Sequence, residues 1–175
     1  VAKAAAAKNI PIRIGVNAGS LEKGLLDKCG GDLPKAMVES AKRHVEILNR
    51  FDFDNIVLSM KSSNVAATVR AYRLASQTFD YPLHLGVTEA GTIKQGIVKS
   101  SVGIGSLLVD GIGDTIRVSL TDDPILEVSA AKSILRALDL DENYIEVVSC
   151  PTCARTKIDL ISIANAVNDA VEGLS

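Results

Sequence analysis

The sequence predicts an α/β fold made of parallel βα units. Four short runs rich in β-branched residues recur along the chain, and a longer stretch with helical periodicity follows each of them. Polar side chains stand directly after each run, where the strands of a (β/α)8 barrel deliver their active-site groups. These observations favour a barrel, and since a complete barrel takes roughly 200 residues or more, four units make about half of one.

The strands are expected at residues 12–16 (IRIGV), 55–60 (NIVLSM), 82–87 (PLHLGV) and 115–120 (TIRVSL). Each run is too short for a buried helix and too apolar for a half-exposed antiparallel strand, so each is expected to be buried on both faces. The segment after the first strand, GVNAGS at residues 15–20, lacks the G-x-G-x-x-G pattern of a dinucleotide-binding turn. This difference argues against a doubly wound nucleotide-binding sheet.

Helices are expected at residues 34–51, 63–79, 94–109 and 122–138. Prolines or polar capping residues mark their starts, with Ser62 or Ser63 as the expected N-cap of the second helix. Gly96, Gly103 and Gly105 weaken the third helix and indicate close packing there. The opening VAKAAAAKN predicts the last turns of a helix, so we expect the chain to start inside a longer protein.

The pattern changes near residue 141. A polar turn is expected at residues 139–143, a fifth strand at 144–149 and a last helix at 158–171, with a CPTC motif between the strand and the helix. Residues 1–140 are therefore predicted to form the second half of a barrel, and residues 141–175 the beginning of another domain. That second segment is shorter than the about 40 residues that usually fold unaided.

Composition excludes several classes of function. The chain has 19 basic and 21 acidic residues, a formal net charge of -2 and no arginine-rich block, so nucleic-acid binding has no support. No apolar run approaches the ~18 residues of a membrane span. Three cysteines, two of them in a CxxC motif, argue against a secreted disulfide framework and predict a cytoplasmic protein.

The CPTC motif is the sharpest local signal. Cys150 and Cys153 are spaced so that both thiolates can bind one zinc ion or iron–sulfur cluster. A thioredoxin-type redox pair and two structural cysteines are the alternatives. Two thiolates do not complete a metal site, and Cys29 is expected to stand alone, so further ligands must lie elsewhere.

A second constellation is basic. Arg13, Lys61 and Arg117 lie in or directly after strands and together predict a barrel interior that neutralises a small polyanion. Lys61 alone also suits a Schiff-base nucleophile or a lysine whose head reaches solvent. Glu89 suits a proton donor or a hydroxyl-binding group, and equally a surface turn residue, while His84 in an apolar strand is expected to be a satisfied core residue.

Four motifs then carry a resemblance: IRIGVNAGSLE, LHLGVTEAG, KSSVGIGSLLVDGIGDTIRVSLTDDP and CPTCART, in this order. The chain resembles 4-hydroxy-3-methylbut-2-enyl diphosphate synthase, the iron–sulfur oxidoreductase of the bacterial methylerythritol phosphate route to isoprenoids. The resemblance implies a TIM-type (β/α)8 barrel followed by an α/β domain that holds a [4Fe–4S] cluster. It also implies reductive dehydration and ring opening of 2-C-methyl-D-erythritol 2,4-cyclodiphosphate, electrons from flavodoxin or ferredoxin, and a homodimer.

The resemblance assigns roles to single residues. It implies substrate binding by Arg13, Asn17, Lys61, Arg117 and Ser119, a catalytic role for Glu89 near the substrate's hydroxyl groups, and cluster binding by Cys150 and Cys153. The family's other barrel half, third cysteine ligand and glutamate ligand have no counterpart in these residues. The chain is therefore expected to be an internal piece of the enzyme, inactive alone.

Two other hypotheses stay open. One is a phosphosugar aldolase or isomerase with Lys61 as the Schiff-base lysine, which leaves the CPTC motif unexplained. The other is a non-catalytic half-barrel whose exposed sheet edges drive self-association.

Overall fold

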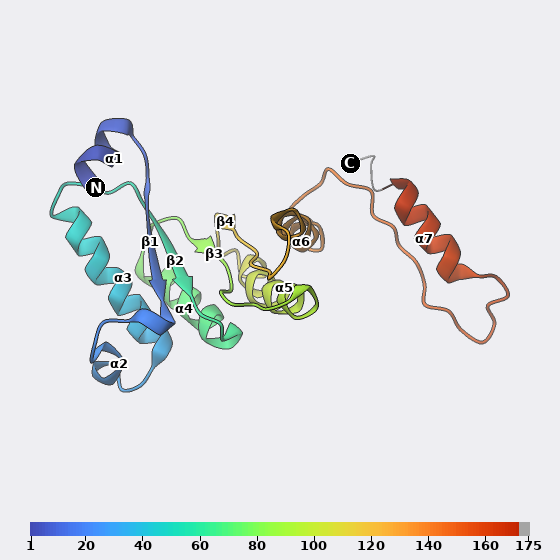
Figure 1. Ribbon diagram of the computed structural model, residues 1–175, viewed down its shortest axis with the longest axis horizontal. Helices are drawn as coiled ribbons and strands as arrows, with labels where there is room; N and C mark the ends of the chain where they lie inside the picture. The colour runs from blue at the N-terminus through green and yellow to red at the C-terminus, as the bar shows by residue number, and fades with distance from the viewer. Residues whose placement is uncertain (172–175) are drawn as a thin grey trace.

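A computed structural model describes residues 1–171 and shows strands and helices in alternation (Figure 1). The elements are α1 (Ala2–Lys8), β1 (Ile12–Asn17), the 3-10 turn η1 (Ala18–Ser20), α2 (Leu25–Lys28), α3 (Leu33–Asn49), β2 (Ile56–Lys61), α4 (Val65–Thr78), β3 (His84–Leu85), α5 (Ile93–Val109), β4 (Thr115–Ile116), α6 (Pro124–Arg136) and α7 (Leu160–Val171). The four expected strands and the expected helices between them are present. The opening residues form α1, as predicted.

The four strands are parallel and neighbour one another in sequence order. β1 pairs with β2 from Ile12 opposite Ile56 to Asn17 opposite Lys61. β3 pairs with β4, and a single bridge between Leu58 and Leu83 joins the two pairs. This order is the one that successive βα units of a barrel produce.

β3 and β4 are shorter than predicted. Each has two residues in regular pairing, although the sequence predicts strands over residues 82–87 and 115–120. Backbone contact continues beyond them, since the Arg117 N–H donates to the Leu85 carbonyl over 2.9 Å. The Thr88 N–H likewise donates to the Ser62 carbonyl over 3.2 Å. The chain stays close to its neighbours there. Between β2 and β3, regular pairing is interrupted by the hydroxyl of Tyr72, described below.

One face of the strands carries the hydrophobic core. Leu58, Met60 and Leu85 have no exposed surface, and α3 and α4 pack against β2 on this side. The other face is open, because Arg13 and Gly15 on β1 are exposed. The expectation that each strand is buried on both faces is therefore wrong. Alternate residues of each strand point to opposite faces, and apart from Val57 the positions facing away from the helices carry polar or small residues.

Polar side chains start the long helices. Asp32 accepts from the Lys35 N–H at the start of α3 over 3.2 Å, and Asp123 accepts from the Ile125 N–H at the start of α6. The N-cap of α4 is Asn64, which accepts from the Ala67 N–H over 2.9 Å. The prediction of Ser62 or Ser63 is wrong by one or two residues, because Ser62 instead accepts from the Asn64 N–H.

The glycines of α5 mark close packing at two of three positions. A Cβ atom on Gly96 or Gly103 would collide with Leu120 or Val87. A Cβ on Gly105 would meet open space, so close packing does not explain this glycine. Close approach at the first two positions lets α5 lie against the segments that follow β3 and β4.

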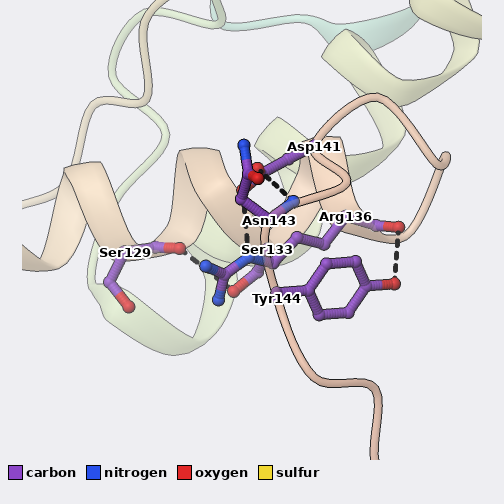
Figure 2. Close-up of polar contacts among 6 residues, drawn as sticks. All are labelled: Ser129, Ser133, Arg136, Asp141, Asn143 and Tyr144. Atoms are coloured by element: carbon purple, nitrogen blue, oxygen red, sulfur yellow. Dashed lines mark hydrogen bonds and ion pairs between the residues drawn. The ribbon is translucent and has the colours of Figure 1, made fainter. Parts of the chain in front are cut away.

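The chain turns sharply after α6 (Figure 2). Arg136 bonds Asp141 through Nε over 3.1 Å, and this contact lowers the pKa of the Asp141 carboxyl. The Tyr144 hydroxyl donates to the Arg136 carbonyl over 3.2 Å, with the guanidinium 5.1 Å from the centre of its ring. Hydrogen bonds thus hold the expected polar turn at residues 139–143 against the end of α6.

The expected fifth strand at residues 144–149 is absent from the described structure. A strand needs a partner edge for its backbone hydrogen bonds, and Figure 1 shows this segment running away from β1–β4. The expected last helix is confirmed as α7, which has no buried residue. None of the helices within residues 1–171 combines the length and the apolar character that a bilayer crossing requires.

Candidate functional site

The candidate site is the open face of the four strands. Because side chains alternate along a strand, the strand residues that face away from the helices are Arg13, Gly15, Asn17, Val57, Ser59, Lys61, His84 and Thr115. In the segments after β3 and β4, Val87 and Leu120 lie against α5, so the same alternation adds Gly86, Thr88, Arg117 and Ser119. All five predicted substrate-binding residues belong to this set. The structure therefore places the predicted basic constellation on a single face.

Lys61 lies at the carboxyl end of β2 and leans toward β1. A Cβ atom on Gly15 would be 3.2 Å from the Lys61 Nζ and 3.3 Å from its Cε. The missing side chain at Gly15 thus leaves the space that the lysine head occupies. Asn17 stands opposite Lys61 in the β1–β2 register.

Asn17 presents a donor to the same face. Its side-chain oxygen accepts from the Gly19 N–H over 3.0 Å and caps the 3-10 turn η1. This bond orients the side chain, and its amide NH2 can donate to another molecule. An amide donor beside a lysine suits an anionic ligand.

Arg117 lies over a glycine of the β3–β4 pair, as Lys61 does in the β1–β2 pair. Its guanidinium lies over Gly86, where a Cβ would be 3.2 Å from Nη2 and 3.3 Å from Nε. The Nη2 atom is buried and has no hydrogen-bond partner among residues 1–171. A buried, unpartnered guanidinium nitrogen is costly unless an anion pairs with it, so this geometry favours an anion on the open face.

His84 differs from its prediction as a satisfied core residue. Its ring lies on the open face, with Nδ1 2.8 Å from the Thr115 hydroxyl oxygen. Its Nε2 is buried, and no group in the described part of the chain bonds it. Burial lowers the pKa of His84, and the positive charges of Arg13 and Arg117 lower it further. The neutral ring thus offers one uncommitted nitrogen beside the two arginines.

The signal for His84 was present in the sequence. In PLHLGV, His84 precedes Gly86 by two residues, so the two share a face of the strand. Ser59 was also missed as a residue of this face, since the apolar run NIVLSM hid its alternation.

Glu89 is exposed and lies in the loop after β3. Its φ of 51° places it in the left-handed region, which non-glycine residues rarely adopt. The same loop is tied to the segment after β4, because the Thr121 N–H donates to the Gly91 carbonyl over 3.0 Å. The structure thus holds Glu89 in a strained backbone position at the carboxyl end of the strands.

Cys150 and Cys153 are exposed. They belong to the segment before α7, which runs away from β1–β4 (Figure 1). A hydrogen bond from the Arg155 backbone, with others from Thr156 and Arg155, lowers the pKa of the Cys153 thiol. This effect favours the thiolate, the form that binds metals. Within residues 1–171, no group of three or more metal-binding side chains is assembled, so the pair suits a metal or cluster only as a partial donor set.

The sequence of this chain matches a known protein family over the residues that form the strands and α1–α5. The sequence profile of the GcpE TIM-barrel domain matches residues 1–132. This chain belongs to the GcpE family. The family match agrees with the parallel βα units seen here and with the barrel expected from the sequence.

Curated relatives of this GcpE-family chain are named 4-hydroxy-3-methylbut-2-en-1-yl diphosphate synthase (flavodoxin). The protein of Clostridium tetani is 61% identical over 173 residues, which cover 99% of this chain and 50% of the relative. The protein of Fusobacterium nucleatum is 59% identical over 169 residues, covering 97% of this chain and 48% of the relative. The chain thus spans about half the length of the curated relatives it matches.

Proposed function

We propose that this chain provides the anion-binding part of a 4-hydroxy-3-methylbut-2-enyl diphosphate synthase. The observation that carries the proposal is the buried Nη2 of Arg117, which lies on the same face as Lys61 and is unpartnered within the residues that the structure describes. Both cations lie over glycines of neighbouring strands, so their charged heads are held against the sheet. The relatives' names and the family match support the same function.

The substrate in this proposal is 2-C-methyl-D-erythritol 2,4-cyclodiphosphate. Arg13, Lys61 and Arg117 would pair with its diphosphate, while Asn17 and Ser119 would donate hydrogen bonds to the oxygens. Glu89 at the strand ends would bind a hydroxyl group or supply the proton when water leaves. The overall change takes up two electrons and two protons, breaks two C–O bonds and releases one water.

The proposed domain division is a second barrel half over residues 1–140 and the beginning of the cluster domain over residues 141–175. The separation of α7 from the strands in Figure 1 supports this division. Cys150 and Cys153 would bind part of a [4Fe–4S] cluster, which would supply the two electrons. Flavodoxin or ferredoxin as donor, a homodimer and a cytoplasmic location complete the proposal, with flavodoxin favoured by the names of the relatives.

The test is calorimetric titration of the full-length protein with the cyclic diphosphate at fixed salt. A charge-assisted hydrogen bond contributes roughly 1.5 to 3 kcal/mol, so Lys61→Ala should weaken binding by about one to two orders of magnitude. Lys42→Ala is the matched control, since Lys42 is exposed on α3. Equal affinity of the wild type and Lys61→Ala would remove Lys61 from the site, and borohydride trapping of a carbonyl substrate on Lys61 would favour an aldolase instead.

A further inference from the structure

Tyr72 places a hydroxyl group between two strands. The residue belongs to α4 and is fully buried. Its side chain extends from the helix to the strands. Its hydroxyl accepts from the Met60 N–H of β2 over 3.0 Å and donates to the His84 carbonyl of β3 over 2.5 Å. One side chain from a helix thus connects the backbones of two neighbouring strands.

The hydroxyl takes the place of a ladder hydrogen bond. On one side of it the Leu58 N–H bonds the Pro82 carbonyl directly over 2.9 Å, and on the other the Thr88 N–H bonds the Ser62 carbonyl over 3.2 Å. In this register the Met60 N–H would bond the His84 carbonyl directly. Two consecutive hydrogen bonds through an oxygen hold the strands further apart than one direct bond does. This insertion also explains why β2 and β3 pair by a single bridge.

The gap lies between the two cations of the site. Lys61 directly follows Met60 on β2. Gly86 lies two residues after His84, and the guanidinium of Arg117 lies over Gly86. Lys61 leans away from the gap toward β1, while Arg117 lies on its β3 side. The width of the gap therefore contributes to the separation of the two positive groups.

We propose that Tyr72 is a positioning residue that sets this separation to suit two linked phosphate groups rather than one. The inference rests on the proposed function, because it takes the open face to be the diphosphate site. Burial raises the pKa of the Tyr72 hydroxyl, although contacts with Ser59 and Met60 and the charges of Arg117 and Arg13 oppose the rise. The group therefore stays protonated and continues to donate to His84. Its ring, buried among core residues, fixes where the oxygen lies.

The experiment replaces only the hydroxyl. Tyr72→Phe in the full-length protein should let the Met60 N–H bond the His84 carbonyl directly and bring the strands together. Calorimetry with inorganic pyrophosphate and inorganic phosphate as probes should then show a selectivity for pyrophosphate about tenfold lower, equivalent to about 1.4 kcal/mol. Tyr81→Phe is the matched control, because the Tyr81 hydroxyl bonds the exposed Asp54 carboxylate. It should leave the selectivity unchanged.

A second variant distinguishes loss of the polar group between the strands from a general loss of folding stability. Replacing Tyr72 with para-aminophenylalanine keeps a polar group in the gap, so it should restore the selectivity that Tyr72→Phe loses. Amide hydrogen exchange at Met60 should be slower in Tyr72→Phe if a direct ladder bond has formed.

The outcomes separate the two proposals. Pyrophosphate binding that depends on Lys61 and keeps its selectivity in Tyr72→Phe would overturn the role of Tyr72 and leave the proposed function standing. Equal weakening of both anions would also overturn it, since that is the result of a merely structural residue. Failure of the wild type to bind pyrophosphate at all would overturn the proposed anion site itself.

Discussion

The guanidinium of Arg117 lies over Gly86, its neighbour on the adjacent strand segment. A Cβ atom at Gly86 would lie 2.9 Å from the Arg117 carbonyl oxygen and 3.2 Å from Nη2. The carbonyl belongs to the backbone that bonds Leu85 and cannot move freely. Glycine at position 86 is therefore a requirement for placing this arginine on the open face.

Gly86→Ala should displace Arg117 and destabilise the fold. Extra volume in a tightly packed site costs about 1 to 3 kcal/mol, and the displaced guanidinium should weaken pyrophosphate binding by about tenfold or more. Gly105→Ala is the control, because a Cβ there meets open space within α5. It should stabilise the protein by roughly 0.5 to 1 kcal/mol through helix propensity. Urea denaturation and calorimetry measure both effects, and unchanged binding in Gly86→Ala would contradict the arrangement.

Local patterns were sufficient to predict the four βα units and the shared position of the cations. Strand and helix periods appear directly in the residue order, and the alternation of a strand assigns Arg13 and Asn17 to one face. The strand expected at residues 144–149 failed because a β-branched run also needs a partner edge, which depends on distant parts of the chain. Tyr72 escaped prediction for a similar reason, since helical periodicity identifies it only as a core residue.

The backbone conformation of Glu89 should lower the stability of the fold, because its φ of 51° lies in the left-handed region. A left-handed backbone costs a non-glycine residue about 1 to 2 kcal/mol, while glycine adds about 0.4 to 1 kcal/mol of unfolded-state entropy. Glu89→Gly should therefore raise the free energy of unfolding, measured in urea, by up to about 1.6 kcal/mol and lower turnover.

Glu89→Gln separates the two roles proposed for the carboxyl group. It retains the length of the side chain and the backbone strain. If the carboxyl group transfers a proton, Glu89→Gln should lower kcat much more than substrate affinity. A loss confined to affinity would indicate hydroxyl binding alone. Full turnover in Glu89→Gln would remove Glu89 from the site.

The cysteine pair makes a separate prediction. The full-length protein purified without oxygen should show the broad visible absorption of a [4Fe–4S] cluster, and Cys150→Ser or Cys153→Ser should remove it. Cys29→Ser is the control within the chain, since Cys29 lies directly after α2 and outside the CPTC motif. Metal analysis that finds zinc instead of iron in the anaerobic protein would contradict the cluster.

His84 should make folding stability depend on pH. Burial, with Arg13 and Arg117, lowers its pKa in the folded protein below the usual 6.5. As the pH falls through 6.5, the unfolded chain takes up a proton that the folded chain does not yet accept. The contribution of His84 to stability is therefore fully present above this pH and is lost as the pH falls through the lower pKa of the folded state.

His84→Gln removes the titrating group and keeps a side chain that can bond Thr115. The free energy of unfolding, measured in urea between about pH 8 and about pH 5, should fall more steeply for the wild type than for the variant. Saturating pyrophosphate should reduce the difference, because a bound anion offsets the positive charges of Arg13 and Arg117 and raises the pKa of the ring. Parallel curves for the two proteins would show that His84 does not keep a lowered pKa in the folded state. A difference that pyrophosphate leaves unchanged would place the anion away from the ring.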